Sequence, residues 1–131
     1  MSRAAQILQR LIGAMFLVAG ISKFFPYLED PYVVLIAAQR ANADGPLALL
    51  SDFALTGAVW VIPLVGAVMI VTGALQLADR GPFIAACLVQ IAMMLMFVAM
   101  LRAAFPAIWL IDGVIALGEL IVIGRRMGWL R

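Results

Sequence analysis

Residues 11–21 read LIGAMFLVAGI, an unbroken apolar run near the start of the chain. Comparable runs follow, and 66% of the 131 residues are hydrophobic while 12% are charged. Soluble domains have about 45–50% apolar and about 25% charged residues, and a domain this small cannot bury so much apolar surface. The mean hydropathy of +1.14 agrees. The sequence therefore predicts an all-α integral membrane protein, and it excludes a soluble enzyme, a nucleic-acid-binding module and a disordered linker.

Four segments are long enough to cross a membrane. A helix needs about 20 residues to span a hydrocarbon core of about 30 Å. We expect a single domain, residues 1–131, folded as a transmembrane four-helix bundle, with spans at residues 4–25, 53–78, 82–101 and 106–124. Pro63 is expected to kink the second span, Pro82 to begin the third and Gly124 to end the fourth.

The connection at residues 26–52 is the longest between these spans. Its segment 32–40 is apolar but too short to cross a membrane, and the sequence NADGP follows it as a turn signal. We expect one short helix here, lying on the membrane surface or over the mouth of the bundle. The same connection is acidic, because it holds Glu29, Asp30, Asp44 and Asp52 against Arg40.

Lysine and arginine residues predict the orientation of the bundle. Cytoplasmic loops carry an excess of these residues. One side would hold Arg3, Arg10, Arg80, Arg125, Arg126 and Arg131, and the other side only Lys23, Arg40 and Arg102. We therefore expect both termini in the cytoplasm and the 26–52 connection outside it.

Two absences limit the chemistry. The chain has no histidine and a single cysteine, Cys87. It therefore has no imidazole ligand for haem, copper or zinc, and no intramolecular disulfide or dithiol relay. The third span is rich in methionines, whose thioether sulfurs can bind copper(I). No cysteine or histidine on the same face would complete such a site, so we interpret these methionines as packing residues. The sequence predicts no metal site and no cofactor held through histidine or cysteine.

The second span repeats the pattern of the first. Residues 64–73 read LVGAVMIVTG, which matches residues 11–20 in the order of its branched, small and large side chains. The repeat places Gly13 and Gly20 in one helix and Gly66 and Gly73 in the other. Small residues allow helix backbones to approach closely in lipid. We expect these glycines to form a tight contact between the two spans.

Residues 10–24, RLIGAMFLVAGISKF, resemble the opening of the DoxX family of small four-helix membrane proteins. The outer connection with its short helix, the glycine-rich second span and the Gly-Pro start of the third also resemble that family. The resemblance implies a quinone-linked redox setting, because members are similar to a small subunit of a thiosulfate:quinone oxidoreductase. This chain departs from the family at Met69, where a glutamate is common. We expect a multi-pass protein of the bacterial inner membrane.

Three ionisable residues fall near the outer ends of the expected spans. Lys23 ends the first span, Arg102 ends the third and Asp112 begins the fourth. Ionisable groups at membrane depth are costly and normally find partners or water. We expect Asp112 to pair with the two cations, either as an interfacial network that fixes the helices or as a site for an anion or a quinone head group.

Glu119 lies seven residues after Asp112, so both occupy nearly one face of the fourth span, about 10 Å apart. No cation is expected at the depth of Glu119, but Gln76 and Gln90 are neutral side chains that could bond to it. Structural pairing and subunit contact are the interpretations we favour for this residue. A proton path along the two carboxyl groups is the functional alternative.

The small size, the missing cofactor ligands and the polar cluster predict an accessory subunit that is not catalytic alone, and the resemblance implies a DoxX-like subunit of a quinone-linked membrane redox complex. Its partners would be lipid and other membrane subunits, or further copies of itself, and not nucleic acid. Two alternatives remain. One is a small-molecule carrier that uses Lys23, Asp112 and Glu119 as a polar pathway. The other is a quinone-linked oxidoreductase in its own right, with catalytic residues that the sequence does not identify.

Overall fold

The computed structural model describes residues 2–28 and 30–130, which form six helices and no strand. The helices are α1 (Arg3–Ser22), α2 (Pro31–Asn42), α3 (Ala48–Thr56), α4 (Ala58–Ala78), α5 (Phe83–Leu101) and α6 (Ile108–Arg126). Met1, Glu29 and Arg131 lie outside the described residues. Two of them, Glu29 and Arg131, belong to the charge pattern that predicts the acidic connection and the orientation. The all-α class is confirmed.

Three helices are long and apolar enough to cross a membrane: α1, α4 and α5. This agrees with a membrane protein. The fourth long helix, α6, has 19 residues like α5, but it carries Asp112, Glu119, Arg125 and Arg126. Its charges set it apart from the other three.

Local capping explains where two of the helices begin. The hydroxyl of Ser2 accepts a hydrogen bond from the backbone N–H of Ala5 at 3.3 Å, at the start of α1. The carboxylate of Asp30 accepts one from the N–H of Tyr32 at 3.0 Å, and Pro31 opens α2. Oxygen acceptors at the N-cap satisfy amide groups that have no partner within the helix, and proline lacks that amide.

The predicted second span, residues 53–78, is wrong at its start. The chain breaks at Gly57, which separates α3 from α4, so the outer connection contains two short helices and not one. Glycine is a poor helix former, and the N–H of Gly57 closes the last turn of α3 on the carbonyl of Phe53 at 2.9 Å. The α4 span therefore begins at Ala58, with Pro63 inside it.

The last helix ends two residues beyond the stop expected at Gly124. The helix α6 continues to Arg126, and Gly128 with φ of +73° supplies the left-handed residue that ends it. Gly124 instead makes room for the returning chain: a Cβ there would lie 2.9 Å from the Leu130 side chain. Pro82 precedes α5 as its N-cap and is not its first helical residue.

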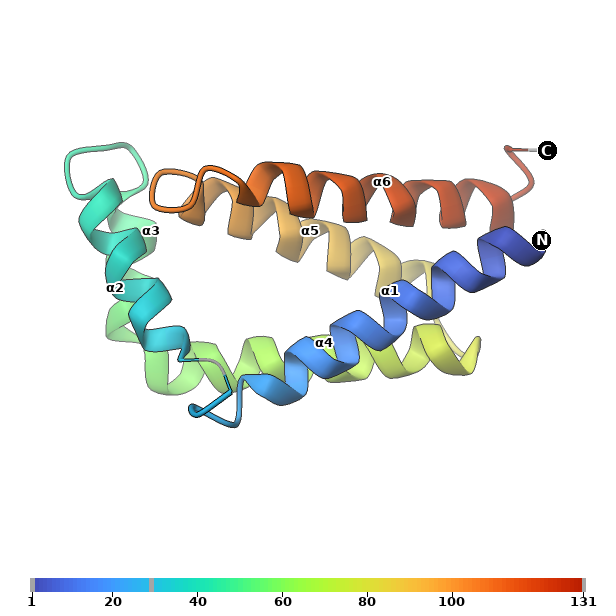
Figure 1. Ribbon diagram of the computed structural model, residues 1–131, viewed down its shortest axis with the longest axis horizontal. Helices are drawn as coiled ribbons and strands as arrows, with labels where there is room; N and C mark the ends of the chain where they lie inside the picture. Colours follow the sequence, from blue (N-terminus) through green and yellow to red (C-terminus); the bar gives the residue numbers. More distant parts are fainter. Residues whose placement is uncertain (1, 29, 131) are drawn as a thin grey trace.

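The long helices form two pairs that diverge. Figure 1 shows α1 beside α4 and α5 beside α6, and each of these pairs is in contact. The pairs come together, through α1 with α6 and α4 with α5, at the end where both termini lie. At the other end they separate, and α2 and α3 lie across the opening (Figure 1). We call these the narrow end and the wide end.

Glycines bring α1 and α4 into backbone contact. A Cβ at Gly20 would lie 2.8 Å from the carbonyl oxygen of Gly66, and one at Gly13 would lie 3.0 Å from that of Gly73. The first glycine of one repeat thus meets the second glycine of the other, as the antiparallel direction of the two helices requires. Any larger side chain would force the helices apart.

Candidate functional site

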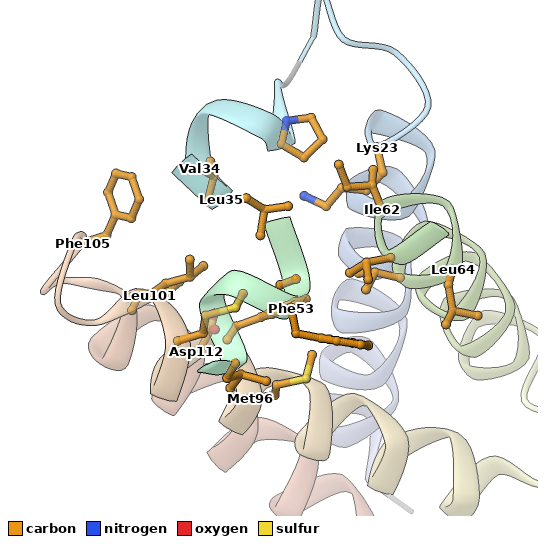
Figure 2. A pocket seen from close by; sticks show the side chains of 18 residues that line it. Lys23, Val34, Leu35, Phe53, Ile62, Leu64, Met96, Leu101, Phe105 and Asp112 are labelled. Atoms are coloured by element: carbon orange, nitrogen blue, oxygen red, sulfur yellow. The ribbon is translucent and has the colours of Figure 1, made fainter. Parts of the chain in front are cut away.

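A cavity of about 530 Å³ lies at the wide end, between α2, α3 and the diverging ends of the long helices (Figure 2). Small-molecule sites have volumes of about 300–1,000 Å³ and are mostly apolar. Most of the lining is aliphatic, and Phe53, Phe97 and Phe105 add aromatic rings while Met96 and Met100 add thioethers. The cavity therefore suits a lipophilic small molecule.

A buried amide holds the two short helices against the bundle. Asn42, at the end of α2, donates from Nδ2 to the carbonyl of Met100 at 2.7 Å and to the hydroxyl of Ser51 at 2.9 Å. Asn42 and Ser51 are both buried. The carbonyls of the last helical turn have no partner within their own helix, so Asn42 satisfies one of them near the end of α5. This contact joins α2, α3 and α5 around the cavity.

Two ionisable side chains line the cavity, Lys23 and Asp112. Figure 2 shows Lys23 reaching in from the end of α1 and Asp112 lying on α6. Both are half-buried. The Oδ2 atom of Asp112 is buried and has no hydrogen-bond partner among the described residues. The cavity thus combines apolar walls with an ammonium group and an acceptor oxygen that can receive a further bond.

The structure brings together part of the set Lys23, Arg102 and Asp112. The lysine and the aspartate share the cavity, but Arg102 is exposed and is not among the lining residues. Within the described ranges, no ion pair joins Asp112 to either cation. The direct pairing expected between these three residues is not present.

Glu119 does not line the cavity and lies in a buried polar layer at the narrow end. It is 0% exposed, and Gln76 donates from Nε2 to its two oxygens at 2.9 and 3.0 Å. Gln9 donates to the backbone carbonyl of Gln76 at 2.9 Å and to the carboxylate of Asp79 at 3.2 Å. The expected bond between Gln76 and Glu119 is therefore present, and Gln9 extends this set of contacts to Asp79.

The same layer includes residues of α5. Cys87 is fully buried, and its Sγ lies 3.8 Å from Gln76 Nε2. Gln90 follows one turn later and is also fully buried, but neither its Nε2 nor its Oε1 has a partner in the described part of the chain. We define the polar layer as Gln9, Gln76, Cys87, Gln90 and Glu119. Each of the four long helices contributes to it.

Sequence reasoning missed the cavity, the role of Asn42 and the place of Gln9. Gln9 stands among polar residues at the start of the chain, where it reads as part of a solvated terminus. A signal was available: Gln9 lies four residues before Gly13, on the face of α1 that packs against α4. The cavity depends on how two helix pairs diverge, and no local pattern encodes that.

The sequence is similar to a protein family and to part of a longer protein. The profile of the "Family of unknown function (DUF6041)" matches residues 6–128. The protein named Oxidoreductase PigB, from Serratia sp. (strain ATCC 39006), is 32% identical over 114 residues, which are 87% of this chain and 17% of that protein. The chain thus spans about a sixth of the length of this relative. No solved structure matches the chain.

The resemblance to the DoxX family is wrong, because the profile that matches is a different one. The resemblance depended on residues 10–24, an apolar helix with glycines seven apart. Such a pattern serves helix packing in lipid and recurs in unrelated membrane proteins. The absence of the expected glutamate at Met69 agrees with this correction. The match covers nearly the whole chain, and the chain belongs to the DUF6041 family.

Proposed function

We propose that this chain is the membrane module of an oxidoreductase assembly, and that its cavity receives a lipophilic redox partner. The cavity at the wide end carries this proposal, because it joins apolar walls to Lys23 and Asp112. A quinone is the model ligand. Its ring and tail suit aliphatic and aromatic walls, while its oxygens need polar partners at one end.

The two ionisable groups match the two redox forms of such a ligand. A quinone presents carbonyl acceptors, and the ammonium group of Lys23 has N–H donors. A quinol presents hydroxyl donors, and Oδ2 of Asp112 is an acceptor without a partner. A few polar groups at defined positions in an apolar pocket fix the orientation of a ligand. The same walls can therefore hold either form.

The similarity to Oxidoreductase PigB supports a role for this chain in a redox assembly. Oxidoreductase PigB carries a segment similar to this chain within a protein about six times as long as the match. In the proposed assembly, this chain supplies the membrane-embedded part and another part supplies the redox centre. The chain's own lack of histidine and its single cysteine support an accessory role. Catalysis by the chain alone is the weaker proposal.

We further propose that α6 is a fourth span beside α1, α4 and α5. It packs along α1 and α5, and its outward residues are apolar: Leu110, Ile111, Val114, Leu117 and Leu120 are all exposed. Its carboxyl group at Glu119 faces inward. With four crossings the termini share one side, and Arg3, Arg80 and Arg126 favour the cytoplasm for that side.

The experiment is quinone binding to the purified chain in detergent, measured by equilibrium dialysis with a short-tailed benzoquinone. Val34 lines the cavity on α2, whereas its neighbour Val33 is exposed outside it. We expect Val34→Trp to fill the cavity and weaken binding at least about tenfold, and the matched control Val33→Trp to leave it unchanged. Equal binding by both variants would remove the cavity from the proposal.

The accessory role is tested by co-purification in mild detergent. We expect larger subunits with a flavin, haem or iron–sulfur group to accompany the chain. The isolated chain should not change quinone absorbance in the presence of a reductant. A purified chain that reduces quinone by itself would instead establish direct catalysis.

A further inference from the structure

The polar layer at the narrow end leaves several of its buried polar atoms without a partner. Gln76 and Gln9 use their Nε2 atoms within the layer or just beyond it. The Oε1 atoms of Gln9, Gln76 and Gln90 are buried and have no partner within residues 2–28 and 30–130. An unsatisfied polar group in hydrocarbon is strongly destabilising. These oxygens therefore require a partner that the side chains do not supply.

The layer also holds one acidic group without a basic partner. Glu119 is fully buried, and its described hydrogen bonds come from a neutral amide. Arg126, seven residues after Glu119 on nearly the same face of α6, forms an ion pair with Asp79 at 2.7 Å. A buried carboxylate without a compensating charge is strongly destabilising. An ionised Glu119 would therefore have no compensating charge in the layer, and three amide oxygens there have no donor.

Each of the four long helices places a side chain in one connected set of contacts. Gln9 contacts Gln76, which contacts both Glu119 and Cys87. Gln90 lies three residues after Cys87, so it is on the same face of α5, one turn away. Its side chain is fully buried with both polar atoms unpartnered. The carboxylate and the amide oxygens together form a donor set of oxygen atoms, which hard cations prefer.

We propose that the polar layer binds one monovalent alkali cation at Glu119. A single positive charge neutralises a single carboxylate, whereas a divalent ion would leave an excess charge buried. The amide oxygens of Gln76 and Gln90 complete the shell, and a water bound to the ion accepts from Gln90 Nε2. Gln9 closes the layer toward Asp79. This site is separate from the cavity, so the proposal is independent of quinone binding.

The test is ion-dependent stability of the purified full-length chain in detergent. Thermal unfolding is followed in sodium chloride, potassium chloride and choline chloride at equal ionic strength and fixed pH. A ligand that binds only the folded state raises the unfolding temperature in proportion to the logarithm of its concentration. We expect Na⁺ or K⁺ to raise it above its value in choline, and to raise it further as the logarithm of the ion concentration increases. Binding of ²²Na⁺ should saturate at one ion per chain, and K⁺ should displace it.

Variants locate the ion. We expect Glu119→Gln to weaken ion binding by about 100-fold or more, because it removes the buried charge. Gln90→Leu should lower ion affinity and yet raise stability in choline, since it removes an unpartnered amide. This variant keeps the test valid if Glu119→Gln fails to fold. Asp112→Asn is the matched control, a second carboxyl on the same helix, and it should keep the ion effect.

Three outcomes would overturn the proposal. Equal unfolding temperatures in all three salts would exclude an alkali cation. Stabilisation by lower pH alone, with no effect of Na⁺ or K⁺, would show that the layer takes only a proton. An ion effect that survives Glu119→Gln and Gln90→Leu but disappears with Asp112→Asn would place the ion in the cavity.

Discussion

Gly13 and Gly73 lie in backbone contact: a Cβ at Gly73 would stand 2.6 Å from the carbonyl oxygen of Gly13 and 2.7 Å from the backbone nitrogen of Leu17. No side chain can yield to relieve that overlap, because both neighbours are backbone atoms. The α1–α4 pair is therefore fixed at its closest approach. Residues at the end of α1 and in the first half of α4 form one wall of the cavity at the wide end.

We predict that Gly73→Ala destabilises the chain by about 1–3 kcal/mol or more, because the added methyl group forces two helices apart. Gly113→Ala is the matched control. Nothing lies within 4 Å of a Cβ at Gly113 on the open face of α6, so its stability should be unchanged or slightly raised. Unfolding in detergent measures both. Equal losses from the two variants would show that the contact does not hold the pair together.

The pair Gln76 and Glu119 gives a second prediction. Gln76→Leu leaves the buried carboxyl group without its amide donor and should cost about 1–3 kcal/mol or more. The double variant Gln76→Leu with Glu119→Leu removes both polar groups, so it should be more stable than Gln76→Leu alone. The same unfolding assay checks this ordering. A double variant that is less stable than the single one would contradict it.

The ion pair between Asp79 and Arg126 should contribute little. Both side chains are partly exposed, at 45% and 37%, and exposed ion pairs are worth about 0–1 kcal/mol. Asp79 also has φ of 52°, a conformation that asparagine tolerates and valine does not. We predict a loss of less than about 1 kcal/mol for Asp79→Asn. A clearly larger loss is expected for Asp79→Val, and similar losses would show that charge and not backbone conformation matters there.

Asn42 controls how firmly the short helices close the cavity. Asn42→Ala removes the bonds to the Met100 carbonyl and the Ser51 hydroxyl, which should cost about 1–3 kcal/mol. We predict faster amide hydrogen exchange across α2 and α3, with little change in α1 and α4. The control is Gln39→Ala, whose bond to Asp52 is exposed. Uniform acceleration over the whole chain would mean that Asn42 supports global folding instead.

Local patterns predict the long helices well but not their arrangement. The repeat of glycines predicts which helices approach, and a Cβ at any of the four glycines would lie 2.6–3.1 Å from a carbonyl oxygen of the other helix. The break at Gly57 was missed because apolar residues continue on both sides of it. When a short apolar helix directly precedes an apolar span, the hydropathy of the two together resembles that of one longer span. The two helices are distinguished by the turn at Gly57, after which the chain runs in a different direction (Figure 1).

The site residues divide in the same way. The bond from Gln76 to Glu119 follows from the need of a buried carboxyl group for a polar neighbour, so sequence reasoning names both residues. The separation of Arg102 from Asp112 does not follow from such a need, since an exposed arginine finds solvent. The family resemblance was wrong for a related reason: apolar composition limits the variety of membrane helices, so likeness over residues 10–24 carries little family information.

The proposed fourth crossing gives the last prediction. Cysteines are introduced at Ala4, Asp44 and Trp129, which are all exposed, while the native Cys87 is fully buried and should not react. Both termini lie at the narrow end, and α2 and α3 lie at the wide end (Figure 1). With four crossings, a membrane-impermeant maleimide should label Asp44→Cys in intact cells, and Ala4→Cys and Trp129→Cys only after permeabilisation. Labelling of Trp129→Cys but not Ala4→Cys in intact cells would mean three crossings, with the two ends on opposite sides. The charged face of α6 would then need a partner other than α1 and α5, because lipid cannot solvate Asp112 and Glu119.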